Sequence, residues 1–263
     1  MILRPTEPPP PTTADFVSAW PAVERLQKQK YESCWMITQP SHAALAGDIA
    51  AKLRDPRIPK LEADLIRAIA LHDAGWGMPD AQAIMRSRSD QRDTPKSFLE
   101  IEVAEFLAAW SQSIDIVQPV SPAGGYMVSR HFWRLAEHRM VHGNDAENDR
   151  KKLTKFLDHE SQRQKKLAAK QNRSTDELER LTDLLQFCDL LSLYICSGAR
   201  ENAEFPECLG WRARLRVEGE GYQLDPPLLE DGAQFRVAAL RHPATKAESS
   251  REIVVTFGNW VTS

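Results

Sequence analysis

The segment 178–199, LERLTDLLQFCDLLSLYICSGA, constrains the fold most, because a helix of this sequence is apolar on nearly every side. Such a helix is stable only in a protein interior, so the segment predicts the most buried helix of the chain. Asp189 lies in the middle of it. A carboxylate in an apolar interior is costly unless it is paired or bound to a cation. The remainder of the chain must therefore provide a partner for Asp189.

Three other polar residues lie at the ends of apolar helical segments. His42 opens HAALAGDIAAKL (42–53), while His72 and Asp73 close PKLEADLIRAIALHD (59–73). Adjacent helical residues point about 100° apart, so His72 and Asp73 do not face each other. Either each has its own hydrogen-bond partner, or an ion between them satisfies both. Two imidazoles and two carboxylates would suit a divalent ion such as Mn, Fe, Zn, Co or Ni, and we expect one per chain.

Apolar spacing predicts a mainly α fold over most of the chain. Gly75 and Gly77 are expected to end the helix 59–73, and the polar segment 80–96 is expected to be a loop. The charged segment 144–180 predicts a long exposed helix, a turn near 172–174 and a new helix. The other predicted helices are 14–30, 97–114 and 123–141.

After Gly210, apolar and polar residues alternate as they do in β-strands, over residues 211–219, 233–240 and 251–258. This predicts a small antiparallel β appendage, joined by a strand at 33–38 and by the first residues. We therefore expect three parts in one unit. They are a Pro-rich segment and helical insert at 1–32, a helical domain at 33–205, and the β-rich appendage at 206–263.

Composition excludes some partners. The net charge of −3 gives no global reason to expect nucleic acid or an anionic membrane. The chain has neither the apolar run of a secretory signal nor one long enough to span a membrane, so a cytoplasmic location is expected. The four cysteines form no C-x-x-C pair, which predicts free, mostly buried thiols.

Four stretches carry a resemblance: WMITQPSHAALAG, AIALHDAGW, SFLE and LLQFCDLLSLYIC. They resemble an uncharacterised bacterial family, domain of unknown function 3891, over about residues 35–200. The order His…His-Asp…Asp also resembles the HD superfamily of metal-dependent phosphohydrolases. The resemblance implies that 33–205 is an HD-domain-like helical bundle. It also implies four metal ligands, namely His42, His72, Asp73 and Asp189.

The same resemblance suggests roles for other residues. Asp73 would act both as ligand and as proton acceptor, and His131 would be a fifth ligand, a site-lining residue or an acid. Lys96, Arg130 and Arg134 lie near the candidate ligands in sequence and could bind phosphate, although each could also be a plain surface charge. Trp76 could stack on a base or sugar, or be an ordinary core residue.

The leading hypothesis is a metal-dependent phosphohydrolase acting on a small phosphorylated metabolite or nucleotide. One alternative is a di-iron oxygenase of the HD fold, which needs a second set of ligands. Another is a non-catalytic binding or scaffold domain that retains the fold. The sequence leaves open whether the protein forms a homo-oligomer.

Overall fold

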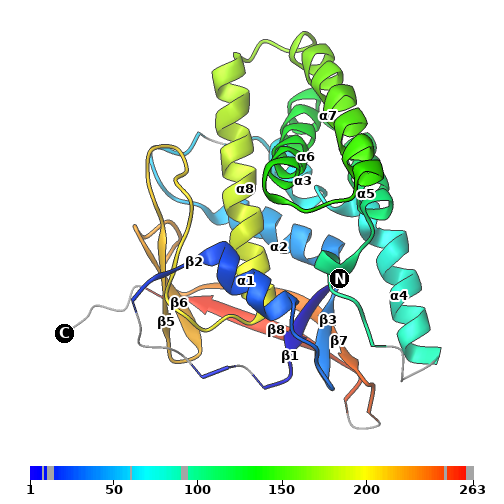
Figure 1. Ribbon diagram of the computed structural model, residues 1–263. Helices are drawn as coiled ribbons and strands as arrows, with labels where there is room; N and C mark the ends of the chain where they lie inside the picture. Colours follow the sequence, from blue (N-terminus) through cyan, green and yellow to red (C-terminus); the bar gives the residue numbers. More distant parts are fainter. Residues whose placement is uncertain (8, 11–14, 60, 90–93, 246–247, 259–263) are drawn as a thin grey trace.

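The computed structural model describes residues 1–7, 9–10, 15–59, 61–89, 94–245 and 248–258. Within these ranges the chain forms helices and one mixed sheet (Figure 1). The helices are α1 (Ala19–Gln27), α2 (Gln39–Lys52), α3 (Ala63–Ala70), α4 (Gly77–Ser89), α5 (Val103–Val117), α6 (Pro122–His142), α7 (Glu147–Ala168) and α8 (Thr175–Ser197), with short 3-10 turns η1 (Ala74–Trp76) and η2 (Phe98–Glu100). The strands are β1 (Ile2–Pro5), β2 (Val17–Ser18), β3 (Cys34–Ile37), β4 (Ala203–Glu204), β5 (Arg214–Glu218), β6 (Gly221–Asp225), β7 (Ala233–His242) and β8 (Ser250–Phe257).

The sheet corrects the predicted fold class. Its eight described strands follow the order β1-β3-β7-β8-β6-β5-β4-β2, and the pairs β6–β8 and β2–β4 are parallel. The fold is therefore mixed α/β, and the prediction of a mainly α protein with a small antiparallel appendage is wrong. The two-residue strands β2 and β4 are too short for alternation to reveal them, since a period of two needs several residues to be recognised.

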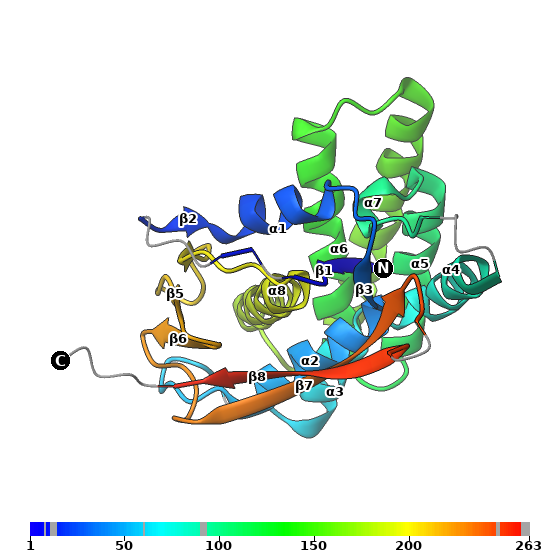
Figure 2. The ribbon, with the colours of Figure 1, turned by 90° about the horizontal axis from the view of Figure 1, so that it is seen from below.

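Helix α8 runs through the middle of the molecule, and α2 packs between it and the strand β7 (Figures 1 and 2). Fifteen residues of α8 are buried, which confirms the prediction of a deeply buried helix. Its start is fixed by Ser174, whose side chain accepts from the backbone N–H of Glu177, while Glu177 accepts from that of Ser174. Gly198 ends the helix in the left-handed conformation, with φ of 73°.

The segment after the His72-Asp73 pair differs from the prediction. Helix α3 ends at Ala70, and Gly77 begins α4 instead of ending a helix. The prediction of a loop is wrong for residues 80–89, which are helical, while 90–93 lie outside the described residues. Helix α4 buries only Asp80 and Ser87, so it lacks the apolar stripe by which a packed helix is recognised.

Other predictions from the sequence are confirmed. Helix α7 ends at Ala168 and α8 starts at Thr175, so the turn falls near residues 172–174 as expected. All four cysteines are free and buried. None of the described helices is both long enough and apolar enough to cross a membrane. For the Pro-rich segment 5–13 the sequence predicts an extended segment without regular structure, which is wrong at Pro5, the last residue of β1; residue 8 and residues 11–13 lie outside the described part.

Candidate metal centre

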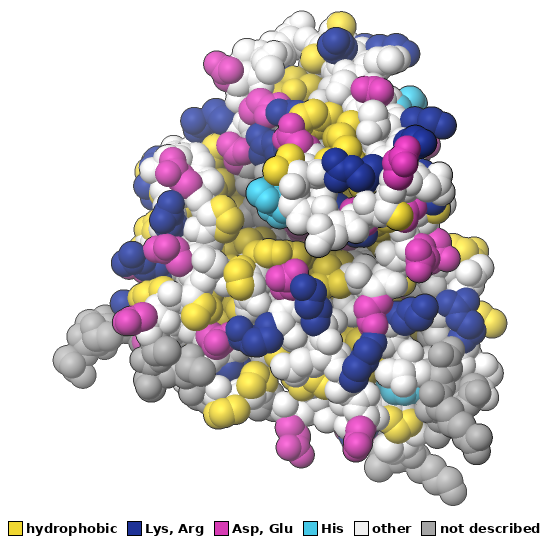
Figure 3. All heavy atoms as spheres, in the orientation of Figure 1, with side chains coloured by type: hydrophobic (Ala, Val, Ile, Leu, Met, Phe, Trp, Pro, Cys, Tyr) yellow, Lys and Arg dark blue, Asp and Glu magenta, His cyan; other side chains and the backbone are white. Residues whose placement is uncertain are grey.

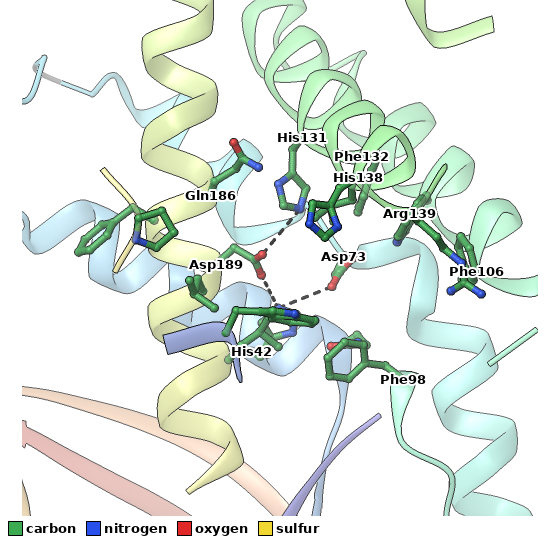
Figure 4. Close-up of a pocket in the computed structure, with 18 of the residues that line it drawn as sticks. His42, Asp73, Phe98, Phe106, His131, Phe132, His138, Arg139, Gln186 and Asp189 are labelled. Carbon is green, nitrogen blue, oxygen red and sulfur yellow. Dashed lines mark hydrogen bonds and ion pairs between the residues drawn. The ribbon is translucent and has the colours of Figure 1, made fainter. Parts of the chain in front are cut away.

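Three helices and one turn bring the candidate ligands and His131 together. Thr38 caps α2 by accepting a hydrogen bond from the backbone N–H of Ser41, which places His42 in the first turn. His72 and Asp73 lie between α3 and η1, where the chain leaves the α-helix. Asp189 comes from the middle of α8, and His131 comes from α6. Figure 4 shows the side chains of His42, Asp73, His131 and Asp189 pointing toward one another.

Asp189 is the centre of this group. Its Oδ1 lies 3.0 Å from Nε2 of His42 and 3.2 Å from Nε2 of His72. Its Oδ2 lies 3.7 Å from Nε2 of His131. Asp73 is on the other side, with Oδ2 3.6 Å from Nε2 of His42 and 3.8 Å from Nε2 of His72. The side chain of Asp189 is 13 % exposed, whereas His42 and His72 are fully buried.

The hydrogen bonding of His72 shows why this arrangement suits a cation. Nδ1 of His72 donates to the carbonyl oxygen of Ile69 at 2.8 Å. In a neutral imidazole Nε2 then carries a lone pair, and that lone pair faces a carboxylate oxygen of Asp189. Two acceptors in contact need either a second proton on His72 or a cation between them. The group of His42, His72 and Asp189 could therefore hold a metal ion.

Several buried atoms of the group also lack partners. Nδ1 of His42, Nδ1 of His131 and Oδ1 of Asp73 have no hydrogen-bond partner among the described residues. Buried polar atoms are usually satisfied, and an ion or a water is one explanation for an exception. The unpaired Oδ1 of Asp73 is consistent with a site that is completed by something other than protein, whereas each unpaired Nδ1 lies on the side of its ring away from Nε2, the atom that faces the carboxylates.

Burial and neighbouring charge shift the acid–base equilibria of the group. Burial alone would lower the pKa of His72, but the nearby charge of Asp73 and the hydrogen bond to Asp189 outweigh it and raise the pKa to about 9. For Asp189, burial opposes ionisation, yet the bonds from His42 and His72 hold the pKa well below its usual range. Burial lowers the pKa of His131 to about 4 and raises that of Asp73. Without an ion, His72 and Asp189 are thus a charged pair and His131 is neutral.

The raised pKa of His72 predicts that metal binding depends on pH. Without metal, His72 keeps its extra proton up to about pH 9, and a metal ion must displace that proton. The apparent affinity should therefore rise about tenfold per pH unit between about pH 6 and pH 8. The proton contributes stability to the metal-free fold below the unfolded pKa of about 6.5, and this is lost as the pH rises through about 9. Competition titrations with a chelator at three pH values measure the slope.

A surface histidine provides the control for this pH dependence. His142 is exposed at the end of α6, so a His142→Gln variant should keep the slope. A flat affinity in the unmodified protein would contradict a protonated His72.

A pocket of about 420 Å³ opens over the group and includes His42, Asp73, His131 and Asp189 in its lining. Seven of the lining side chains are aromatic, and we call them the aromatic wall: Trp20, Trp76, Phe98, Phe106, Trp110, Phe132 and Phe187. On the molecular surface, hydrophobic side chains gather in a hollow across the middle of the face shown in Figure 3. The candidate ligands are therefore accessible through a mostly apolar entrance.

The predicted substrate-binding residues are not all near this pocket. Trp76 lines it, with 3 % of the residue exposed. Lys96 lines a separate pocket beside Glu100 and Glu102. Arg130 is paired with Glu179 at 3.0 Å and lies over the ring of Trp133 at 4.4 Å. The structure thus brings Trp76 to the candidate ligands but not Lys96 or Arg130.

Arg134 does not line the pocket, and it pairs at 2.7 Å both with Glu179 and with Asp183, which does line it. Sequence reasoning missed Arg139, Gln186 and Phe98, which line the pocket. The spacing gives no clear signal for Arg139, because eight positions after His131 place it about 80° around α6, whereas His138, seven positions after His131, shares its face and also lines the pocket. Phe98 belongs to SFLE, one of the stretches that carry the family resemblance, but its place in the pocket depends on how η2 packs against α1.

The comparison with protein families identifies the chain. A family model described as Protein of unknown function (DUF3891) matches residues 26–226. The chain belongs to this family. Neither the curated proteins nor the solved structures include a significant match. The DUF3891 match contains all four candidate ligands and His131, whereas Trp20 and the strands β1, β7 and β8 lie outside it.

Proposed function

We propose that this member of DUF3891 is a metal-dependent phosphohydrolase of the HD type, acting on a small phosphorylated molecule. The observation that supports the proposal is the convergence of His42, His72, Asp73 and Asp189, from separate helical segments, at a pocket open to small molecules. The ligand types suit Mn, Fe, Zn, Co or Ni, and the spacing leaves room for one ion.

The roles of the residues follow from their positions. His42, His72, Asp73 and Asp189 would hold the ion, which when bound supplies an activated water and stabilises charge on a phosphoryl oxygen. Asp73 has a free Oδ1 that could accept a proton from that water. Neutral His131, with Nε2 3.7 Å from Asp189, would be a fifth ligand or would orient the substrate. The buried floor of the pocket would strengthen each of these electrostatic interactions.

The test is the metal content of protein purified without an affinity tag or chelator, measured by elemental mass spectrometry. We expect about one transition-metal ion per chain, together with activity in a screen of phosphomonoesters and phosphodiesters. A His72→Ala variant should lose the ion, whereas the exposed His142→Ala variant should keep it.

The same measurement separates the alternatives. Two irons per chain would favour oxygen chemistry over hydrolysis. Protein that binds no metal, even after metal is added back, would contradict the proposal and favour a binding or scaffold domain.

A further inference from the structure

We propose that the aromatic wall selects a substrate with one apolar ring and a single small anionic group, the ring contacting Trp20 and Phe98 and the anionic group reaching the metal-binding residues. This inference deepens the proposed function and rests on it, because it names the class of substrate for the same pocket. Three independent features of the pocket support it: its lining, its charge and its entrance.

The lining provides contact area for a ring. Besides the seven aromatic side chains, it contains Leu99, Leu135, Leu190 and Leu193. Trp110 stacks on Phe132, with ring centroids 4.9 Å apart and planes 14° apart, which makes part of the wall rigid. Aromatic faces attract a ligand ring both by burying apolar area and by favourable ring–ring geometry. A volume of about 420 Å³ is within the range that holds a ring and one polar group.

The charge of the pocket disfavours polyphosphates. Its described lining includes four carboxylates, on Asp73, Asp183, Asp189 and Glu207, and one guanidinium, on Arg139. Of the four, Asp183 is already paired, at 2.7 Å, with Arg134 from outside the lining. The guanidinium of Arg139 is already paired with Asp145, at 2.9 and 2.6 Å. It also lies over the ring of Phe106 at 4.8 Å. A chain of phosphates would therefore meet carboxylates without a free arginine to offset its charge.

The entrance is formed by residues from two distant parts of the chain. Trp20, on α1, contacts Phe98, on η2, with ring centroids 6.5 Å apart. Trp20 is 36 % exposed, so a ligand can reach its ring. Trp20 also precedes the part of the chain that matches the DUF3891 model. The segment containing α1 thus adds an aromatic side chain to a pocket otherwise built by the family-matched region and makes Trp20 a specificity-determining residue.

The experiment compares two non-hydrolysable ligands that share one anionic group. Phenylphosphonate and methylphosphonate are titrated calorimetrically into metal-loaded protein. We expect phenylphosphonate to bind at least about tenfold more tightly, since only it buries a ring. A Trp20→Ala variant should lose most of this preference while its affinity for methylphosphonate is unchanged. Trp133 lies on α6 outside the pocket, so Trp133→Ala is the matched control and should keep the preference.

Equal affinities for the two phosphonates would overturn the inference, and so would a preference that survives Trp20→Ala. Tighter binding of inorganic triphosphate than of phenylphosphonate would also contradict it.

A second titration separates this inference from the proposed function. Metal-free protein is titrated with 1-naphthol, which has rings but no anionic group, and tryptophan fluorescence is followed. Binding that weakens in Trp20→Ala supports the aromatic site even if the protein proves to hold no metal. Hydrolysis of phosphomonoesters without any preference for ring-containing ones would leave the proposed function intact and refute the aromatic selection.

Discussion

Replacing Asp189 with asparagine should abolish metal binding and lower phosphohydrolase activity by more than about a hundredfold. Oδ1 of Asp189 is within 3.2 Å of Nε2 on both His42 and His72, so one carboxylate organises both imidazoles. Asparagine has the same shape but no charge, so the variant tests the charge and not the packing. Elemental analysis and a phosphatase assay measure the two losses, and thermal unfolding shows whether the protein is still folded.

Asp183→Asn is the matched control for this variant. Asp183 lies on the same helix and lines the same pocket, but its partner is Arg134 and not a histidine. We expect this control to retain the ion. Wild-type metal content and activity in Asp189→Asn would refute the assignment of Asp189 as a ligand.

Replacing Gly75 with alanine should destabilise the protein by about 3 kcal/mol or more. A Cβ atom at Gly75 would be 2.1 Å from the carbonyl oxygen of Ala109 and 2.7 Å from the backbone nitrogen of Ser113. Both atoms belong to the backbone of α5, which cannot move aside as a flexible side chain would. Either α5 or η1 must shift, and η1 directly follows Asp73. Chemical denaturation measures the loss of stability.

Gly77 offers a control two residues away. A Cβ atom there would meet no heavy atom within 4 Å, and its backbone is helical, with φ of −55°. Gly77→Ala should therefore change stability little, or stabilise by about 0.5 kcal/mol by restricting the unfolded chain. Equal denaturation midpoints for the two variants would show that the close approach of η1 to α5 is relieved at no cost.

The grouping of His42 and His72 around Asp189, which could hold a metal ion, is the part of the molecule that follows most directly from the sequence. A carboxylate in an apolar helix demands a partner, and that demand does not depend on the details of packing. The structure provides the partners of Asp189 from α2 and from the end of α3. The buried helix α8 and the turn before it were predictable for a similar reason, since a long apolar segment after a capping Ser174 leaves few alternatives.

The substrate-binding residues were less predictable because neighbours in sequence are not neighbours on a helix. Arg130 precedes His131, but about 100° of helix rotation turns it toward Glu179 on α8 instead of the pocket. The sheet was underestimated for a related reason. The two-residue strand β4 is defined by backbone pairing with β5 and with the distant β2, and two residues carry no periodic signal.

The position of β3 has a consequence for how the chain folds. β3 lies between β1 and β7, so its two neighbours come from opposite ends of the described chain. Such pairing gives a high contact order, and proteins of high contact order fold slowly, because distant segments must meet before contacts stabilise them. Helix α2, which carries His42, packs against β7. The side of α2 that faces the sheet is therefore covered only when β7, a strand from near the end of the described chain, has joined the sheet. One histidine of the candidate metal site is thus held by a helix whose packing is completed only after residues 233–242, which form β7, have been synthesised.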